Sequence, residues 1–431
     1  MALQALREPL IDPRSSRGPG EFEIPSSLYV HVPFCASRCS YCDFFSTVPG
    51  SRGPSVMEAV VSGTLARLEA LSDRFSAKEF RTLYVGGGTP SFLPRQALRR
   101  LLNGIGMRAD SGAEWTVEAN PESVDEEFLA ILEGEGVTRL SLGVQSLDDR
   151  LLAELGRPSD AASALSALRL AARRKLRLSA DLIAGFEREG GLAEEAGILA
   201  DEGCGHVSIY DLTLESGTLL EGRWSKGEFA LEDEDRAADE REAAEDGLSR
   251  RGLTRYEVSN YALPGMESEH NLVYWRMGSW LGVGPGASGT IARRSEGPAI
   301  PGVDGGCLRV DEARSLEAYS SESGPTAVET EVGPFDAAFE VVMMAFRTKA
   351  GLDRDAFERR FGLDPLSIIG ESLEKWRRHV GREGASLCLD SRGLDLLNSF
   401  LSDCLAEMEG IFPQRPGEVR AEPSARHTKK S

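Results

Sequence analysis

The sequence predicts an α/β fold in which a partial barrel of six strand–helix units is followed by a small α-rich C-terminal domain. Short β-branched or apolar runs recur six times after Ser26, and each precedes a longer segment with the apolar spacing of a helix. Repeated strand–helix–strand units favour a parallel sheet with right-handed crossovers. Six such units favour a partial (β/α)6 barrel over a flat, doubly wound sheet.

The expected strands follow one another through the first half of the chain. In order they are LYVHV, TLYVG, WTVEA, RLSLGV, RLSADLIAG and HVSIYDL. We therefore expect the core barrel over residues 26–225 and an extension of it over residues 226–300. The charged run at 227–251 opens with acids and closes with arginines, which suits the dipole of a solvent-facing helix.

Residues 301–412 form the expected C-terminal domain. FDAAFEVVMMAFRTKAGLD and ESLEKWRRHV have the spacing of amphipathic helices, and SLCLDSRGLDLLNSFLSDCLAEM predicts a strand, a turn and a final helix. The two ends of the chain differ in composition. Residues 1–25 are rich in Pro and Gly, which predicts a flexible leader, and residues 413–431 are polar and basic, which predicts a disordered tail.

The composition limits the classes of partner. The formal charge is 49 − 69 = −20, so no basic field concentrates nucleic acid or anionic lipid at the surface. No run of eighteen apolar residues occurs, and the first residues lack the apolar centre of a signal peptide. Seven cysteines, an odd number, suit reduced thiols. We expect a cytoplasmic protein that does not bind nucleic acid and meets a membrane only through a partner.

Three cysteines lie within eight residues, directly after the first expected strand. Cys35, Cys39 and Cys42 have the spacing C-x3-C-x2-C. Soft sulfur ligands this close together suit an iron–sulfur cluster or zinc. A structural zinc site needs a fourth protein ligand, whereas a cubane held by three cysteines leaves one iron open. The pattern favours a [4Fe–4S] cluster, and zinc with His31 as the fourth ligand is the alternative.

Glycines and polar residues follow other expected strands at their C-terminal ends, where barrel sites are built. GGGT at residues 86–89 ends the second strand, and glycines there allow the backbone to approach a ligand closely. Four further polar residues lie at or soon after strand ends: Glu118, Gln145, Arg157 and Asp181. Taken singly, each is as compatible with a helix cap or an ion pair as with a ligand.

Together these motifs resemble the signature of radical S-adenosylmethionine enzymes, in which an aromatic residue, here Tyr41, precedes the third cysteine. The resemblance implies a [4Fe–4S] cluster whose open iron binds the amino and carboxylate groups of S-adenosylmethionine within a (β/α) barrel. Over about residues 26–410 the chain is similar to the coproporphyrinogen dehydrogenase/HemW branch. That similarity implies an S-adenosylmethionine site lined by Tyr29, Gly87, Gly88, Thr89, Glu118, Gln145, Arg157 and Asp181.

Two positions bear on the activity that the branch resemblance implies. Coproporphyrinogen dehydrogenases carry a fourth cysteine two positions after the third, where this chain has Phe44. The HemW-like members share an H-N-x-x-Y-W motif linked to haem binding, which begins here at His270 and ends at Trp275. The resemblance implies a chaperone that binds haem, with His270 as a candidate ligand, and delivers it to a client protein. It also implies a flavodoxin-like electron donor.

Two other functions remain open. One is oxygen-independent decarboxylation of coproporphyrinogen III to protoporphyrinogen IX, and the other is a zinc-stabilised binding protein without catalytic activity. The chain departs from the branch at Ser159, where the family has histidine, and at GFEREG after Ala184, where the family has Gly-Leu-Pro-Gly-Gln. Both departures fall on the barrel rim, so they bear on the geometry that faces haem or substrate.

Overall fold

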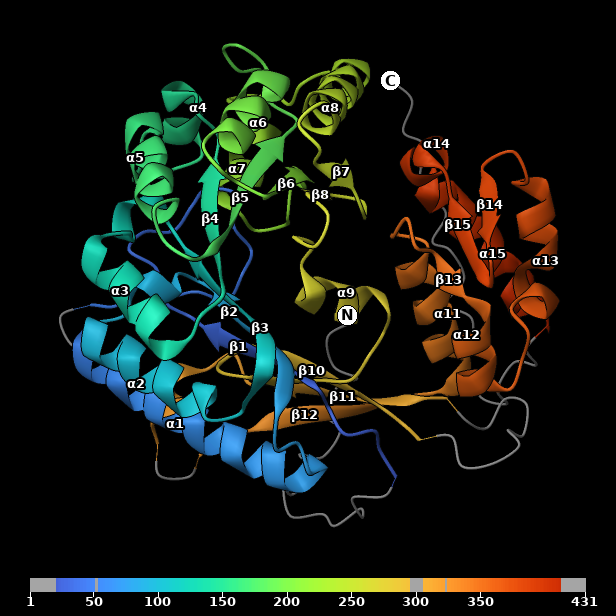
Figure 1. The fold of residues 1–431 in the computed structure, drawn as a ribbon, viewed down its shortest axis with the longest axis horizontal. Coiled ribbons are helices and arrows are strands. Elements are labelled where there is room, and N and C mark those ends of the chain that lie inside the picture. Colours follow the sequence, from blue (N-terminus) through green and yellow to red (C-terminus); the bar gives the residue numbers. More distant parts are fainter. Residues whose placement is uncertain (1–20, 51–52, 295–304, 322–323, 412–431) are drawn as a thin grey trace.

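The computed structural model describes residues 21–50, 53–294, 305–321 and 324–411 (Figure 1). The expected leader, apart from residues 21–25, and the expected tail at 413–431 lie outside the described residues.

Six parallel strands form the centre of the main sheet, as the sequence predicts. They are β1 (Ser27–Val32), β2 (Phe80–Gly87), β3 (Ala109–Ala119), β4 (Arg139–Gln145), β5 (Arg177–Ala184) and β6 (His206–Asp211). They lie side by side in chain order, and each expected strand falls on one of them. Because the sheet is curved but open, the partial (β/α)6 barrel is confirmed (Figure 1).

The sheet extends beyond both edges of the parallel strands. Beside β6 lie β8 (Asn260–Ala262) and β7 (Thr254–Arg255). Beside β1 lies β9 (Trp280–Val283), followed by the antiparallel strands β10 (Ser288–Ala292), β11 (Cys307–Glu312) and β12 (Ala327–Val332). The boundary expected at residue 301 therefore falls inside the large sheet, because β11 and β12 complete its edge.

Helices cover the outer face of the parallel strands (Figure 1). The longer ones are α1 (Gly53–Phe75), α2 (Arg95–Gly106), α3 (Glu126–Glu135), α5 (Ala161–Ala171) and α6 (Leu192–Asp201). Shorter ones are η1 (Pro90–Phe92), η2 (Pro121–Ser123), α4 (Asp149–Glu154), α7 (Leu219–Ser225) and α10 (Leu316–Ser320). The charged run contains α8 (Glu234–Ser249), which packs on α6 and exposes most of its residues, as expected.

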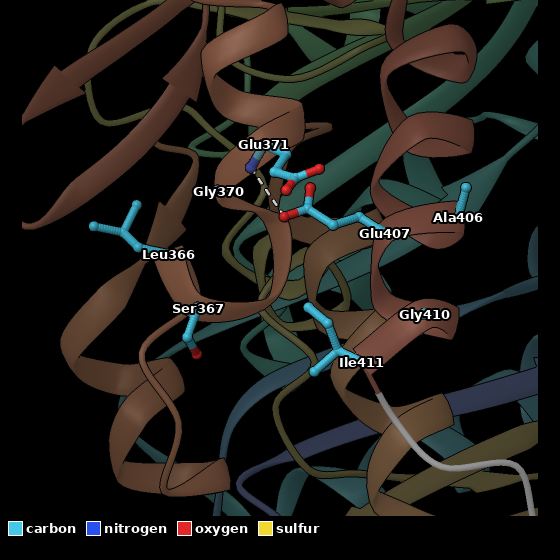
Figure 2. Close-up of a pocket in the computed structure, with 8 residues that line it drawn as sticks. All are labelled: Leu366, Ser367, Gly370, Glu371, Ala406, Glu407, Gly410 and Ile411. Atoms are coloured by element: carbon cyan, nitrogen blue, oxygen red, sulfur yellow. Dashed lines mark hydrogen bonds between the residues drawn. The ribbon is translucent and has the colours of Figure 1, made fainter.

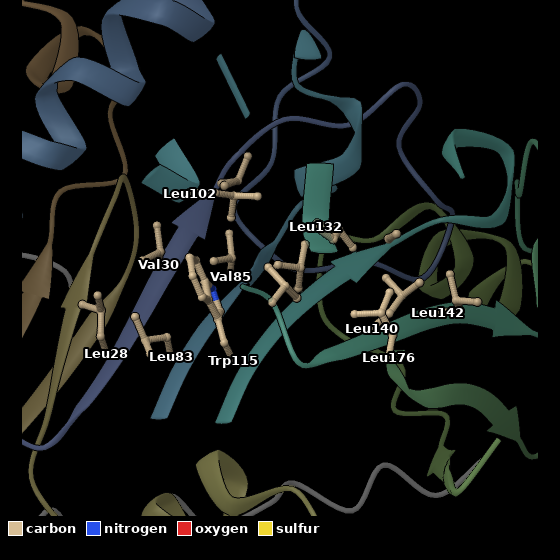
Figure 3. Close-up of a cluster of buried hydrophobic side chains, with 14 of the residues drawn as sticks. Leu28, Val30, Leu83, Val85, Leu102, Trp115, Leu132, Leu140, Leu142 and Leu176 are labelled. Atoms are coloured by element: carbon tan, nitrogen blue, oxygen red, sulfur yellow. The ribbon is translucent and has the colours of Figure 1, made fainter. Parts of the chain in front are cut away.

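The main hydrophobic core lies between the sheet and these helices (Figure 3). Along β1 and β2 the apolar residues alternate, so that Leu28 and Val30 pack beside Leu83 and Val85. The residues between them face the barrel interior instead, as Tyr29 and Tyr84 do. A strand that is apolar on one side and polar on the other thus both anchors the sheet and lines a site.

The C-terminal part has its own hydrophobic core, which is formed from α11 (Pro334–Ala345) onward and also includes Met277. It contains α12 (Arg354–Phe361), α13 (Leu366–Lys375), α14 (Ser391–Asp395) and α15 (Leu397–Ile411). A small sheet joins β13 (Leu352–Asp353), β15 (Ser386–Leu389) and β14 (Val380–Glu383). The α-rich composition is as predicted. Among the described residues, we found no helix with both the length and the apolar composition needed to span a bilayer.

Candidate functional site

The three clustered cysteines lie on a loop that leaves the C-terminal end of β1. Backbone hydrogen bonds hold this loop on both sides. The amide of Cys35 donates to the carbonyl of Thr47 at 3.2 Å, and Ser40 is bonded through its amide to Leu155 and through its carbonyl to Leu220. All three cysteines are free thiols and partly exposed. Burial raises the pKa of the Cys35 and Cys42 thiols, so the uncharged thiol is favoured while no metal is bound.

The surroundings of the loop suit an anionic cluster better than zinc. His31, the expected fourth zinc ligand, uses Nδ1 toward the Tyr29 hydroxyl at 2.9 Å and Nε2 toward the Phe45 carbonyl at 2.8 Å. In this conformation a tetrahedral zinc site would therefore lack its expected fourth ligand. A cubane is larger than one ion and takes three thiolates. The cysteine loop therefore fits a [4Fe–4S] cluster.

The glycines at the end of β2 lie directly against the cysteine loop. The amide of Gly88 donates to the Val32 carbonyl at 2.8 Å, and the amide of Thr89 donates to the Phe34 carbonyl at 2.7 Å. A Cβ on Gly88 would lie 2.7 Å from each of these two carbonyl oxygens. The hydroxyl of Thr89 also reaches the Sγ of Cys35 at 3.5 Å. The glycine segment, residues 86–89, thus needs its glycines to approach the loop itself as well as any ligand.

Glu118 connects the glycine segment to the barrel interior. Its Oε2 accepts from the amide of Gly87 at 3.1 Å, and its Oε1 accepts from the hydroxyl of Tyr84 at 2.6 Å. Burial raises the pKa of Glu118 to about 7; the Tyr84 hydrogen bond opposes this rise and the charge of Asp181 adds to it. Burial likewise raises the pKa of Asp181, which contacts Ser141 at 3.5 Å. These two carboxyls form the acidic side of the interior.

Arg157 is the positive group beside the cysteine loop. Its Nη1 lies 3.5 Å from the Sγ of Cys39, and its Nη2 donates to the Gly143 carbonyl at 2.6 Å and to Asn120 Oδ1 at 3.0 Å. Asn120 in turn donates to the Thr89 hydroxyl at 3.1 Å. Asn120 was not among the predicted site residues, although it lies two residues after Glu118 in the same strand-end segment.

The expected cofactor residues therefore converge on one edge of the sheet to different extents. Gly87, Gly88, Thr89, Glu118 and Arg157 form one hydrogen-bonded network with the cysteine loop. The remaining three are Tyr29, Gln145 and Asp181. The Tyr29 hydroxyl is hydrogen-bonded to His31 and lies beside the network. Gln145 has a φ of 71° and lies at an irregularity in the β4–β5 pairing.

The H-N-x-x-Y-W segment forms helix α9 (Glu269–Trp275) at the other end of the strands. The amides of Glu269 and His270 donate to the carboxylate of Glu114 at 3.2 and 3.0 Å, which fixes the start of the helix. His270 is 0% exposed. Burial lowers its pKa to about 3. The helix therefore closes the bottom of the barrel, away from the cysteines.

Both ring nitrogens of His270 are occupied. Nδ1 lies 2.8 Å from the Thr82 hydroxyl and Nε2 lies 2.7 Å from the Tyr274 hydroxyl. Since Thr82 donates to Ser27, Nδ1–H donates to Thr82 and the lone pair of Nε2 accepts from Tyr274. In this conformation neither nitrogen is available to haem iron, so ligation at His270 requires α9 to rearrange.

A shallow pocket lies far from this network, between α13 and α15 of the C-terminal part (Figure 2). Its lining includes Glu407, whose carboxylate accepts from the amides of Glu371 and Ser372 at 2.9 and 2.8 Å. None of the residues that the sequence singles out lies in it. It has the contacts of a helix–helix junction.

Comparison with known proteins agrees with this geometry. The pattern of the Radical SAM superfamily matches residues 29–190, and that of the HemN C-terminal domain matches residues 334–396. The heme chaperone HemW of Escherichia coli K12 is 34% identical over 394 residues, which are 89% of this chain and 99% of that protein. The heme chaperone HemW of Mycobacterium tuberculosis H37Rv is 40% identical over 272 residues, 62% of this chain and 70% of that protein.

Among solved structures, the coproporphyrinogen III oxidase HemN from Escherichia coli, a radical SAM enzyme, has the same fold. It superposes with a TM-score of 0.69 at 19% identity, over 90% of this chain and 91% of the other. The fold and the three-cysteine loop thus define a radical SAM protein, a class whose members use a [4Fe–4S] cluster and S-adenosylmethionine. Within that class, the chain belongs to the HemW family.

Proposed function

We propose that this protein is a haem chaperone that binds haem and passes it to a client protein. Relatives called heme chaperone HemW are similar to nearly the whole chain. The observation that favours a chaperone over a coproporphyrinogen dehydrogenase is Phe44, a residue that stands where the dehydrogenases carry a further cysteine and that is 68% exposed. An exposed aromatic ring beside the cysteine loop offers apolar contact area, not a ligand.

The proposal assigns distinct tasks to the residues of the network. Cys35, Cys39 and Cys42 hold a [4Fe–4S] cluster, and Arg157 offsets its negative charge. S-adenosylmethionine lies against the glycine segment, with Glu118 available to its polar groups, and Tyr29, Gln145 and Asp181 complete the same binding site. Bound together, the cluster and S-adenosylmethionine supply one-electron chemistry. Helix α9, whose His270 is fully buried, shields this binding site from water on the side that faces the start of the strands.

The partners follow from the same proposal. Haem is the cargo, a haem-accepting protein is the client, and a flavodoxin-like protein is the electron donor. His270 remains a predicted haem ligand only for a conformation in which α9 releases it, because both nitrogens are hydrogen-bonded here. We place the protein in the cytoplasm.

The test uses the anaerobically purified full chain. About four iron and about four sulfide ions per chain are expected, as a cubane requires, together with a saturable Soret shift on titration with haemin. Haem should then pass to apomyoglobin added as a probe acceptor. Absence of a saturable shift would refute the chaperone. Formation of protoporphyrinogen from coproporphyrinogen III, S-adenosylmethionine and a reductant would instead establish the dehydrogenase, and zinc without sulfide would establish the zinc-stabilised protein.

A further inference from the structure

A continuous set of contacts joins helix α9 to the glycine segment across the barrel interior. The ring of His270 stacks on the ring of Tyr84, with centroids 5.2 Å apart and an interplanar angle of 30°. The hydroxyl of Tyr84 donates to Glu118, whose other oxygen accepts from the amide of Gly87. Two hydrogen bonds and one stacked ring pair thus connect helix α9, at the N-terminal ends of the strands, to the glycine segment at their C-terminal ends.

The contacts around His270, where this path begins on helix α9, are rigid. His270 is buried between Thr82 of β2 and Tyr274 of its own helix. The ring of Tyr274 packs edge-on against Trp280 of β9, with centroids 4.7 Å apart. Glu114 of β3 also fixes the start of α9, so the fully buried imidazole is held by Thr82 and Tyr274 on a helix that is itself anchored to the sheet.

At the other end of the path, the position of Glu118 depends on where the ring of Tyr84 lies. Its ring lies between His270 and Tyr29, the latter with centroids 6.2 Å away, and these neighbours set its orientation. The bond from Tyr84 to Glu118 also opposes the rise in the carboxyl pKa that burial causes. If Tyr84 shifts, Glu118 therefore loses both a positional restraint and a partner that favours its charged form.

We infer that His270 is a positioning residue for the S-adenosylmethionine site, acting through Tyr84 and Glu118 on the glycine segment. The H-N-x-x-Y-W helix, α9, thus supports that site from the N-terminal ends of the strands. The inference rests on the proposed binding of S-adenosylmethionine, but it is independent of haem binding. It accounts for a histidine whose two nitrogens are both engaged inside the protein.

The test measures S-adenosylmethionine affinity on the cluster-reconstituted full chain, with His270→Ala, Tyr84→Phe and the double variant. Equilibrium dialysis should show each single variant weakened by about tenfold, and the double variant weakened no further, because both changes interrupt one path. The change that S-adenosylmethionine induces in the EPR spectrum of the reduced cluster should diminish in parallel. Additive losses in the double variant would contradict the inference.

His206→Ala is the matched control. His206 is also buried, at 2% exposed, and is held between the hydroxyls of Ser179 and Tyr256, each at 2.8 Å. Its hydrogen bonds and ring contacts involve neither Tyr84 nor Glu118, so this variant should lose stability while its S-adenosylmethionine affinity stays within about twofold of the wild type. Tyr84→Phe alone keeps the test decisive if His270→Ala does not fold.

The outcomes separate the inference from the proposed function. If the wild-type protein holds its cluster but binds no S-adenosylmethionine, the proposed cofactor site fails. If the wild type binds it and both single variants bind equally well, the inference alone fails. If His270→Ala abolishes haem binding while S-adenosylmethionine affinity is unchanged, His270 is a haem ligand and the positioning role is refuted.

Discussion

The guanidinium of Arg157 lies 3.5 Å from the Sγ of Cys39 while it also donates to the backbone of Gly143. A fixed positive charge beside an anionic cluster stabilises the reduced form, which carries one more electron. We predict that Arg157→Gln lowers the reduction potential of the cluster, whereas Arg157→Lys, which keeps the positive charge, lowers the potential much less. An EPR-monitored redox titration measures the difference.

Arg100→Gln provides the control for this prediction. Arg100 lies on the outer helix α2, is about half exposed and pairs with Glu58, so its loss should leave the potential unchanged. Equal potentials in wild type and Arg157→Gln would show that Arg157 acts only as a structural link.

Gly88→Ala tests the close approach of the glycine segment to the cysteine loop. The new Cβ would lie 2.7 Å from two backbone carbonyl oxygens, neither of which can move without shifting the loop. We expect a loss of about 1–3 kcal/mol in the free energy of unfolding, as for other overpacked sites, and less iron per chain after reconstitution. Urea denaturation and iron analysis measure the two effects.

Gly134→Ala is the paired control, because a Cβ at this position in α3 meets nothing within 4 Å. It should leave the iron content unchanged and stabilise the helix by up to about 1 kcal/mol. A normal iron content in Gly88→Ala would mean that the loop tolerates displacement from the glycine segment.

The sequence revealed those features that are encoded locally. The strand runs and the cysteine motif are each complete within a few residues, so both can be recognised from the sequence alone, and Gly87, Thr89 and Glu118, expected at strand ends, do lie together at one edge of the sheet. Contacts between distant segments could not be predicted. Arg157 and Asn120 are 37 residues apart, and Thr82 and His270 are 188 apart. The engaged state of His270 depends on such long-range packing.

The GFEREG segment, which departs from the family pattern, contains half of a buried ion pair. Arg188 Nη1 lies 2.6 Å from Glu195 Oε2, and their side chains are 0% and 4% exposed. Glu195 also accepts from the Ser146 hydroxyl and the Leu147 amide at 2.6 and 2.7 Å. Arg188→Ala should destabilise the protein by about 3–5 kcal/mol, because it leaves a buried carboxylate without its counter-charge. Chemical denaturation provides the measurement.

The exposed pair Arg377–Glu374 serves as the comparison, with side chains 68% and 75% exposed. Arg377→Ala should change the free energy of unfolding by no more than about 0.5 kcal/mol. An equally small effect of Arg188→Ala would mean that water reaches Glu195 once the guanidinium is gone.

Glu257 makes stability depend on pH where the barrel meets the C-terminal part. It is 0% exposed, and its backbone forms an isolated antiparallel β-bridge with Thr348. Its carboxylate accepts a hydrogen bond from the Ser259 amide at 3.0 Å. Burial raises its pKa from 4.5 to about 7, an effect that the Ser259 hydrogen bond and Arg255 partly oppose. Between these values the folded protein keeps a proton that the unfolded chain has released. Its contribution to stability is therefore full below about pH 4.5 and lost as pH rises through about 7.

Glu257→Gln isolates this contribution, since the amide has nearly the same shape and no charge to bury. The variant should gain stability relative to the wild type as pH rises, by an amount on the order of 3 kcal/mol between about pH 4.5 and about pH 7. Thermal unfolding followed by circular dichroism from about pH 5 to about pH 8 measures this difference. A constant offset between the two proteins across that range would mean that Glu257 is ionised throughout, with its charge stabilised by the neighbouring Arg255.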